Sequence, residues 1–262
     1  MKIRLVAVAL FASIHAILAR GDETVSDAPL PRLALIVSEF EYRTHETLPQ
    51  FAREHLEKNF RVSYLVNSDE DNHDLGGLMR VLSDTDIVVL SVWRRALPKN
   101  QLNALRQYVD SGKPIVAIRT TCHGFTTRDG KVPNGRALWA EFDREVLGCH
   151  YTGHHGNKGS DETITKVWTA KNQGDHPILR GVTTDEITVA SWLYKVSPLS
   201  DSAKPLLMGR AGDRKPDEPV AWTNKTVSGG RVFFTTLGHP EDFKLPAFER
   251  LLANGIAWAA GK

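Results

Sequence analysis

The chain has 262 residues, with 33 lysines and arginines against 31 aspartates and glutamates, and its formal net charge at pH 7 is +2. This near balance, without a basic block or a stripe of interleaved basic and aromatic residues, excludes a typical nucleic-acid-binding protein. The length suits one large α/β domain with a full hydrophobic core.

The first 19 residues have the pattern of an export signal. Two basic residues precede the apolar run Leu5–Leu18, and Ala19 is a small residue suited to cleavage. The run is too short to span a bilayer comfortably, and no Cys follows it to carry a lipid anchor. We therefore expect an exported protein, periplasmic or extracellular, with no membrane anchor. Residues 1–19 would be removed, and residues 20–31 would form a disordered leader.

Strands and helices then alternate as far as residue 125. Continuous apolar runs predict strands buried on both faces, and apolar residues at helical spacing predict the helices between them. The strands are expected at Leu33–Val37, Arg61–Val66, Ile87–Ser91 and Ile115–Ile118, and the helices at Thr47–Asn59, Leu75–Leu82 and Pro98–Ser111. Such alternation forms right-handed βαβ units and therefore a doubly wound parallel sheet.

The pattern changes after residue 125. Residues 125–160 are rich in Gly and His without clear periodicity, which is typical of a functional or lid-like loop. Val232–Thr235 then returns to the main sheet, and Pro246–Ala260 closes the chain as an amphipathic helix. Between them, a small antiparallel addition at one end of the sheet is predicted from β-type segments at Thr163–Trp168, Ile187–Val196, Leu206–Met208 and Val220–Thr223.

Candidate functional residues follow the predicted parallel strands. Ligands of open α/β sheets bind beyond the carboxyl ends of the strands. The segments that leave those ends are 38–45, 92–95, 119–124 and 238–243, and all four should line one crevice.

Cys122 follows a buried strand in a turn that contains Gly124, which is the layout of a nucleophile elbow. With His239 and Glu241 it has the order of a Cys–His–Glu triad, in which an imidazole activates the thiol and a carboxylate orients the imidazole. Thr120, however, stands where such an elbow has its first Gly.

Two other roles stay open for Cys122. It can be a small, half-buried core residue. Alternatively, Cys122 and Cys149, the two cysteines of the chain, can form a disulfide, since an even number of cysteines in an oxidising compartment permits one.

Histidines gather near the predicted elbow. His123 is part of it, and His150, His154 and His155 lie in the Gly-rich loop that follows. The loop is too broken by Gly for a metal-binding helix, but its imidazoles suit contacts with sugar hydroxyls. We expect no cofactor; a divalent metal held by the three loop histidines, or a purely structural loop, are the alternatives.

Two further side chains complete the candidate set. Arg119 ends a buried strand, so its guanidinium must point into the crevice or pair with an acid. Trp93 is suited to stacking on a sugar ring, or to packing under the loop. The candidate catalytic residues are His239, Glu241, Cys122 and His123, and the candidate substrate-binding residues are Arg119, Trp93, His154, His155 and Asp242.

Four segments resemble the ThuA-like (trehalose-utilisation) family of the class I glutamine amidotransferase-like superfamily: Ile118–Phe125, Tyr151–Asn157, His176–Ile178 and Thr236–Phe243. The resemblance implies a flavodoxin-like α/β domain over residues 32–262. It also implies a role in the use of carbohydrate, with disaccharides or their 3-keto derivatives as substrates. Relatives frequently lack Cys at position 122, so the frame of Arg119, Thr120, His123 and Phe125 is the more meaningful signature.

The leading hypothesis is therefore an exported enzyme for which a small carbohydrate is the partner. A keto group acidifies the neighbouring C–H, so positioned imidazoles or carboxylates can transfer its proton. The acid and base would be drawn from His123, His154, His155, His239 and Glu241. A Cys–His–Glu hydrolase of amides or esters and a non-catalytic sugar-binding module are the alternatives.

Overall fold

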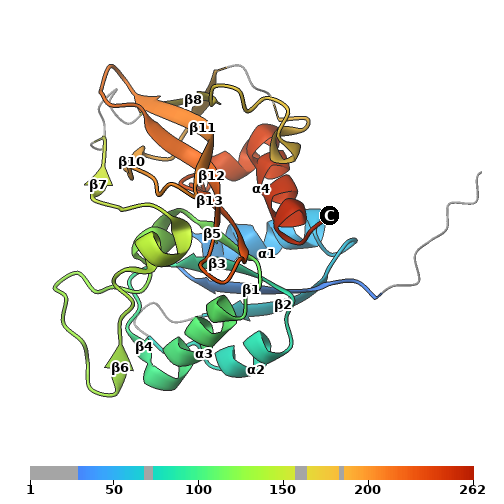
Figure 1. The fold of residues 1–262 in the computed structure, drawn as a ribbon, viewed down its shortest axis with the longest axis vertical. Coiled ribbons are helices and arrows are strands. Elements are labelled where there is room, and N and C mark those ends of the chain that lie inside the picture. Colours follow the sequence, from blue (N-terminus) through green and yellow to red (C-terminus); the bar gives the residue numbers. More distant parts are fainter. Residues whose placement is uncertain (1–28, 68–72, 157–163, 183–185) are drawn as a thin grey trace, which may run out of the picture.

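The computed structural model describes residues 29–67, 73–156, 164–182 and 186–262 (Figure 1). The predicted signal segment and most of the predicted leader lie outside these ranges, as do Asn157 and the first residue of the strand predicted at Thr163–Trp168. Among the described residues, no helix has both the length and the apolar character that a membrane span requires.

The described residues form a mixed sheet of nine strands with a parallel core. The parallel strands, in spatial order, are β2 (Arg61–Val66), β1 (Arg32–Ser38), β3 (Ile87–Val92), β5 (Ile115–Ile118) and β13 (Arg231–Thr235). The sheet continues through antiparallel strands β12 (Glu218–Lys225), β11 (Lys204–Ala211), β8 (Thr165–Thr169) and β9 (Ile187–Val189). The prediction of a doubly wound parallel core with an antiparallel addition at one end is thus confirmed.

Helices cover both faces of the parallel core (Figure 1). α1 (Thr44–His55) and α4 (Pro246–Ala259) share one apolar core with Leu35 of β1, and α2 (Leu78–Ser83) and α3 (Lys99–Asp110) share the other with Ile36. Successive side chains of a strand point to opposite faces. The continuous apolar strands are therefore buried on both faces, as the sequence predicts.

α4 packs closely against the sheet at Gly255. A Cβ at this position would lie 2.2 Å from Cδ1 of Phe233, whose side chain is fully buried in β13. The glycine lets the helix approach the strand that leads into the His239 segment.

One predicted strand, Ile187–Val196, is wrong as a single element. It divides into β9, which pairs with β8, and β10 (Tyr194–Lys195), which pairs with β7 (Gly153–His154). Between them, the N–H groups of Ala190 and Ser191 donate to the carboxylate of Asp242 at 2.9 and 3.3 Å. A carboxylate from a distant turn thus takes backbone donors that a continuous strand would have used.

Two smaller differences also have local causes. α1 begins at Thr44, three residues earlier than predicted, because the Glu39 carboxylate accepts both the N–H and the hydroxyl of Thr44, at 3.1 and 2.7 Å. The loop after residue 125 is not wholly irregular. It contains β6 (Arg136–Ala137), which pairs with β4 (Leu97–Pro98), then one π-helical turn (Asp143–Leu147), and then β7.

Candidate functional site

The segments that follow the parallel strands meet at one edge of the sheet. The Trp93 N–H, after β3, donates to the Ser38 carbonyl at the end of β1 at 3.0 Å. Nη1 of Arg119, after β5, donates to the Thr236 carbonyl after β13 at 3.1 Å. The carboxyl ends of parallel strands share an edge, so side chains far apart in the sequence come together there.

Rings and a guanidinium form a connected group at this edge, which we call the strand-end cluster: Tyr42, Arg119, His123, Tyr151, Tyr194 and His239. The Arg119 guanidinium carbon lies 3.8 Å from the ring centroid of Tyr42 and 5.2 Å from that of Tyr194. Tyr194 contacts Tyr151 at 4.8 Å, and Tyr151 stacks on His123 at 4.3 Å. His239 meets the Tyr42 ring at 6.1 Å in an edge-to-face arrangement.

Arg119 occupies the strained position of the turn after β5. Its φ is +48°, in the left-handed region, and it opens a 3-10 helix at Arg119–His123. In a nucleophile elbow the nucleophile holds this conformation. Here Arg119 holds it, three residues before Cys122, and its side chain is only 1 % exposed. The turn therefore orients a guanidinium where the elbow hypothesis expects a thiol.

Cys122 lies behind this turn in the hydrophobic core, 3 % exposed. Burial raises the pKa of the thiol well above its usual range, and Cys149 and Asp143 act in the same direction. Both cysteines are free and buried. Sγ of Cys122 lies 3.3 Å from Nδ1 of His123. Such a thiol stays protonated at neutral pH and is a poor nucleophile.

His239 and Glu241 lie in one turn but do not adopt the contacts of a triad. Nδ1 of His239 accepts the backbone N–H of Glu241 at 3.2 Å. The Glu241 carboxylate is exposed and accepts from Lys244 at 2.6 Å. In a triad the carboxylate accepts a hydrogen bond from the Nδ1–H group, whereas this Nδ1 is itself an acceptor. The neutral His239 ring therefore carries its proton on Nε2.

The two cluster imidazoles are neutral at neutral pH. Burial, followed by the charges of Arg94 and Arg119, lowers the pKa of His123 to about 3. Burial also lowers the pKa of His239, an effect that Asp242 opposes and Arg119 reinforces. A charged guanidinium in a poorly solvated site disfavours a second positive charge nearby.

Asp242 is fully buried and acts as the centre of the turn. Besides the amides of Ala190 and Ser191, it accepts the Ser191 hydroxyl and the N–H groups of Gly238 and His239 at 3.0 and 3.1 Å. These bonds fix the backbone of His239 and use the lone pairs of both carboxylate oxygens. The substrate-binding role predicted for Asp242 stays a prediction, and its contacts are those of a positioning residue.

The other predicted substrate-binding residues differ in exposure. Trp93 is half-buried, with the Arg128 guanidinium 5.0 Å from its ring. His154 is exposed and packs on Trp192 at 4.7 Å, while His155 is buried. The exposed His154, packed on the half-buried Trp192, is therefore available for a polar ligand near the cluster.

The described structure does not gather the loop histidines around one point. His150 lies 3.3 Å from the carboxylate of Asp143, whereas His154 is on Trp192 and His155 is buried. The divalent-metal alternative predicted for these three residues therefore has no geometric basis within the described residues.

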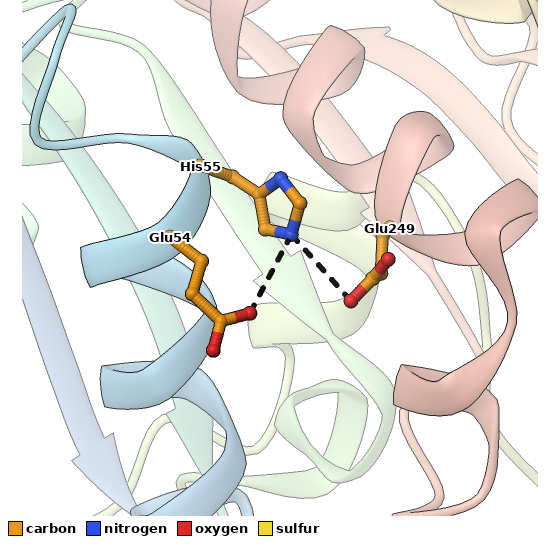
Figure 2. A group of neighbouring side chains, drawn as sticks. All are labelled: Glu54, His55 and Glu249. Atoms are coloured by element: carbon orange, nitrogen blue, oxygen red, sulfur yellow. Dashed lines mark ion pairs between the residues drawn. The ribbon is translucent and has the colours of Figure 1, made fainter.

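A different trio has its potential ligand atoms close together. Within the described ranges, Glu54, His55 and Glu249 are the one group of three such residues, with these atoms within 4.8 Å of one another. Figure 2 shows His55 and Glu54 on α1 facing Glu249 on α4, with Nε2 of His55 3.5 Å from Glu249 and 3.9 Å from Glu54. These solvent-accessible ion pairs join two surface helices and lie outside the strand-end cluster. We interpret them as a helix–helix contact worth at most about 1 kcal/mol.

Sequence reasoning missed Tyr42, Tyr151, Tyr194 and Trp192. Tyr42 lies on segment 38–45, which the sequence predicts to line the crevice, so its position indicates a site residue. Tyr194 is about 75 residues from Arg119 in sequence, and its place in β10 depends on the division of the predicted strand. Nothing in the local sequence around Tyr194 indicates that it contacts the Arg119 guanidinium.

The sequence matches the family model described as "ThuA: Trehalose utilisation" over residues 33–259. Among solved structures, a putative ThuA-like protein from Bacteroides uniformis is 16 % identical, with TM-score 0.63 over 88 % of this chain and 93 % of that one. A putative ThuA-like protein from Parabacteroides merdae is 18 % identical, with TM-score 0.63 over 89 % and 91 %. The mmIFT52 N-terminal domain has 11 % identity and TM-score 0.55 over 88 % and 97 %. None of the curated proteins matches.

Proposed function

Since the chain belongs to the ThuA (trehalose utilisation) family, we propose that it is an exported enzyme that carries out acid/base chemistry on an oxidised sugar, such as a 3-keto-glycoside. The observation that carries this proposal is the pairing of two neutral imidazoles, His123 and His239, with the permanently charged guanidinium of Arg119. Neutral imidazoles beside a fixed positive charge suit a reaction in which negative charge develops on the substrate.

His239 is the proton donor in this mechanism. Its Nδ1 accepts the backbone N–H of Glu241, so the ring proton is on Nε2, and the side chain is only half-buried. A neutral imidazole that donates from Nε2 polarises a keto oxygen without first being protonated, which makes the neighbouring C–H more acidic.

His123 is the proton acceptor. Its low pKa keeps the ring unprotonated but also makes it a weak base. Abstraction therefore requires an acidic C–H, which a keto group polarised by His239 and lying in the field of Arg119 provides. In a 3-keto-glycoside the proton would leave C2, its electron pair would form the C1–C2 double bond, and the C1–O bond would break. The departing oxygen then takes up a proton.

The aromatic part of the site supports a sugar ligand. The rings of Tyr42 and Tyr151 are half-buried, and the exposed His154 lies beside the half-buried Trp192. Such amphipathic rings suit the apolar faces of sugars and the hydroxyls between them. The hydrolase alternative has less support, because its thiol is buried and its carboxylate pairs with Lys244.

The test is a product assay on 3-keto-glycosides and on the parent disaccharides, with three proteins: wild type, His239→Ala and Cys122→Ala. We expect turnover of the keto sugar by wild type and Cys122→Ala, and a loss of at least 100-fold in kcat/KM for folded His239→Ala, on the scale of one proton-transfer group. Loss of turnover only in folded Cys122→Ala would return the thiol to the mechanism. Thermal stabilisation by the sugar without product in any protein would favour the binding-module alternative.

A further inference from the structure

The guanidinium of Arg119 has donors that the described protein does not use. Nη1 donates to the Thr236 carbonyl at 3.1 Å, but Nε and Nη2 have no hydrogen-bond partner among the described residues. Both atoms are buried, and the whole side chain is 1 % exposed. Buried donors of a charged group are costly to leave unpaired, so they indicate a site where another molecule supplies the acceptors.

The two unused donors define the shape of the missing partner. Nε and Nη2 lie on the same edge of the planar guanidinium, and this edge binds the two oxygens of a carboxylate side by side. The guanidinium carbon lies 3.8 Å from the ring centroid of Tyr42 and 5.2 Å from that of Tyr194, and the Tyr42 side chain also hydrogen-bonds to the group. Nε and Nη2 still lack a partner among the described residues, so this edge is the part of the group left to a ligand.

The surrounding charge favours an anion. Arg94 and Arg128 add positive charge near His123, and Nε of Arg94 is also buried with no hydrogen-bond partner in the described part of the chain. Asp242 is close enough to act on Arg119, but its two oxygens are already held by backbone amides and the Ser191 hydroxyl. Positive charge therefore predominates around the cluster among the described residues.

We propose that the strand-end cluster binds the carboxylate of an acidic sugar, such as a uronate or an aldonate, through the Nε–Nη2 edge of Arg119. The sugar part of this statement rests on the proposed function, whereas the carboxylate goes beyond it, since a neutral keto sugar does not need one. Because both donors are enclosed, the ligand must displace a covering group. Tyr42 contacts the guanidinium and is only half-buried, in the segment between β1 and α1, so it is the group that we expect to move.

The first test uses the wild-type protein and two isosteric sugars in isothermal titration calorimetry. D-glucuronate and D-glucuronamide differ in the charge and the acceptor pair at one carbon, so we expect the acid to bind at least ten-fold more tightly. D-galacturonate and D-gluconate extend the probe to other acidic sugars, and glucose 6-phosphate tests a different anion. Three results would overturn the proposal. The first is equal affinity for the acid and the amide, and the second is tighter binding of the phosphate than of every carboxylate. The third is that no acid binds at millimolar concentration.

The second test compares two Arg→Lys variants. Arg119→Lys keeps the charge but loses the two-donor edge, and should bind the carboxylate at least ten-fold more weakly. Arg210→Lys is the matched control. Arg210 is on β11, outside the cluster, and pairs with Asp217, so this variant should bind as wild type. Unchanged affinity in a folded Arg119→Lys protein removes Arg119 from the site.

The two proposals fail separately. Carboxylate binding without turnover of any oxidised sugar leaves this inference standing and removes the enzymatic proposal. Turnover of neutral keto sugars without preference for the carboxylate supports the enzymatic proposal and removes this inference.

Discussion

Replacing Asp242 with Asn should destabilise the protein strongly, because the carboxylate accepts from four backbone N–H groups and one hydroxyl. An amide presents an NH₂ group in place of one oxygen. At Oδ1 that group would face the N–H groups of Ala190 and Ser191, and at Oδ2 those of Gly238 and His239. In the first orientation the amides of Ala190 and Ser191 lose their acceptor; in the second the Gly238 amide and the Ser191 hydroxyl lose theirs, while the His239 amide keeps Oγ of Ser191 at 3.2 Å. Either orientation therefore leaves two buried donors without an acceptor, at about 1–3 kcal/mol each, so we expect a loss of about 3 kcal/mol.

The assay is urea unfolding followed by fluorescence, with thermal unfolding as a second measurement. For a domain of this size, a loss of about 3 kcal/mol lowers Tm by roughly 6–12 °C. Asp217→Asn is the control, because that carboxylate pairs with Arg210 and Lys215 at the surface and should contribute about 0–1 kcal/mol. If Asp242→Asn unfolds within 1 kcal/mol of wild type, the turn has other acceptors and the view of Asp242 as its centre is refuted.

Three further predictions concern the packing and the titration of the site. Gly255→Ala should lower stability by about 2 kcal/mol, since its Cβ would lie within 2.3 Å of two ring atoms of buried Phe233. Gly76→Ala, with open space around its Cβ, should change stability by less than about 1 kcal/mol in the same urea titration. Cys122 should react with iodoacetamide at pH 7 far more slowly than a free thiol, because burial raises its pKa, and rapid labelling in the native state would contradict this. The pKa of His123 falls to about 3 on folding, so the unfolded state binds the proton first and stability should decrease as pH falls from about 6.5 toward 3. A His123→Gln variant should show a shallower decrease, and an equal slope would indicate that other groups cause it.

The parallel half of the fold was predictable because its signals are local. β1, β3 and β5 are continuous apolar runs, and each is buried on both faces with bounds within one residue of the prediction. The shared edge of their carboxyl ends follows from parallel pairing alone. Parallel pairing therefore predicts from the sequence that Arg119 and His239 lie at the same edge of the sheet.

The parts that could not be predicted depend on contacts between distant residues. The division of Ile187–Val196 is caused by Asp242, about 50 residues away, and no local propensity shows it. The same holds for Tyr194, which reaches Arg119 only because β10 pairs with β7. Side chains that act through long-range contacts have no periodic signature in their own segment.

The turn after β5 explains why a Cys at position 122 was a misleading signal. A fold of this kind presents whichever side chain takes the left-handed position at the end of the strand, because that residue is turned out of the sheet. In this chain Arg119 takes it, and the following 3-10 turn carries Cys122 back into the core. A guanidinium cannot attack a carbonyl, but it can hold and stabilise negative charge. The position at which the elbow hypothesis expects covalent catalysis is therefore better suited, in this protein, to binding an anion and to assisting proton transfer by the neutral imidazoles beside it.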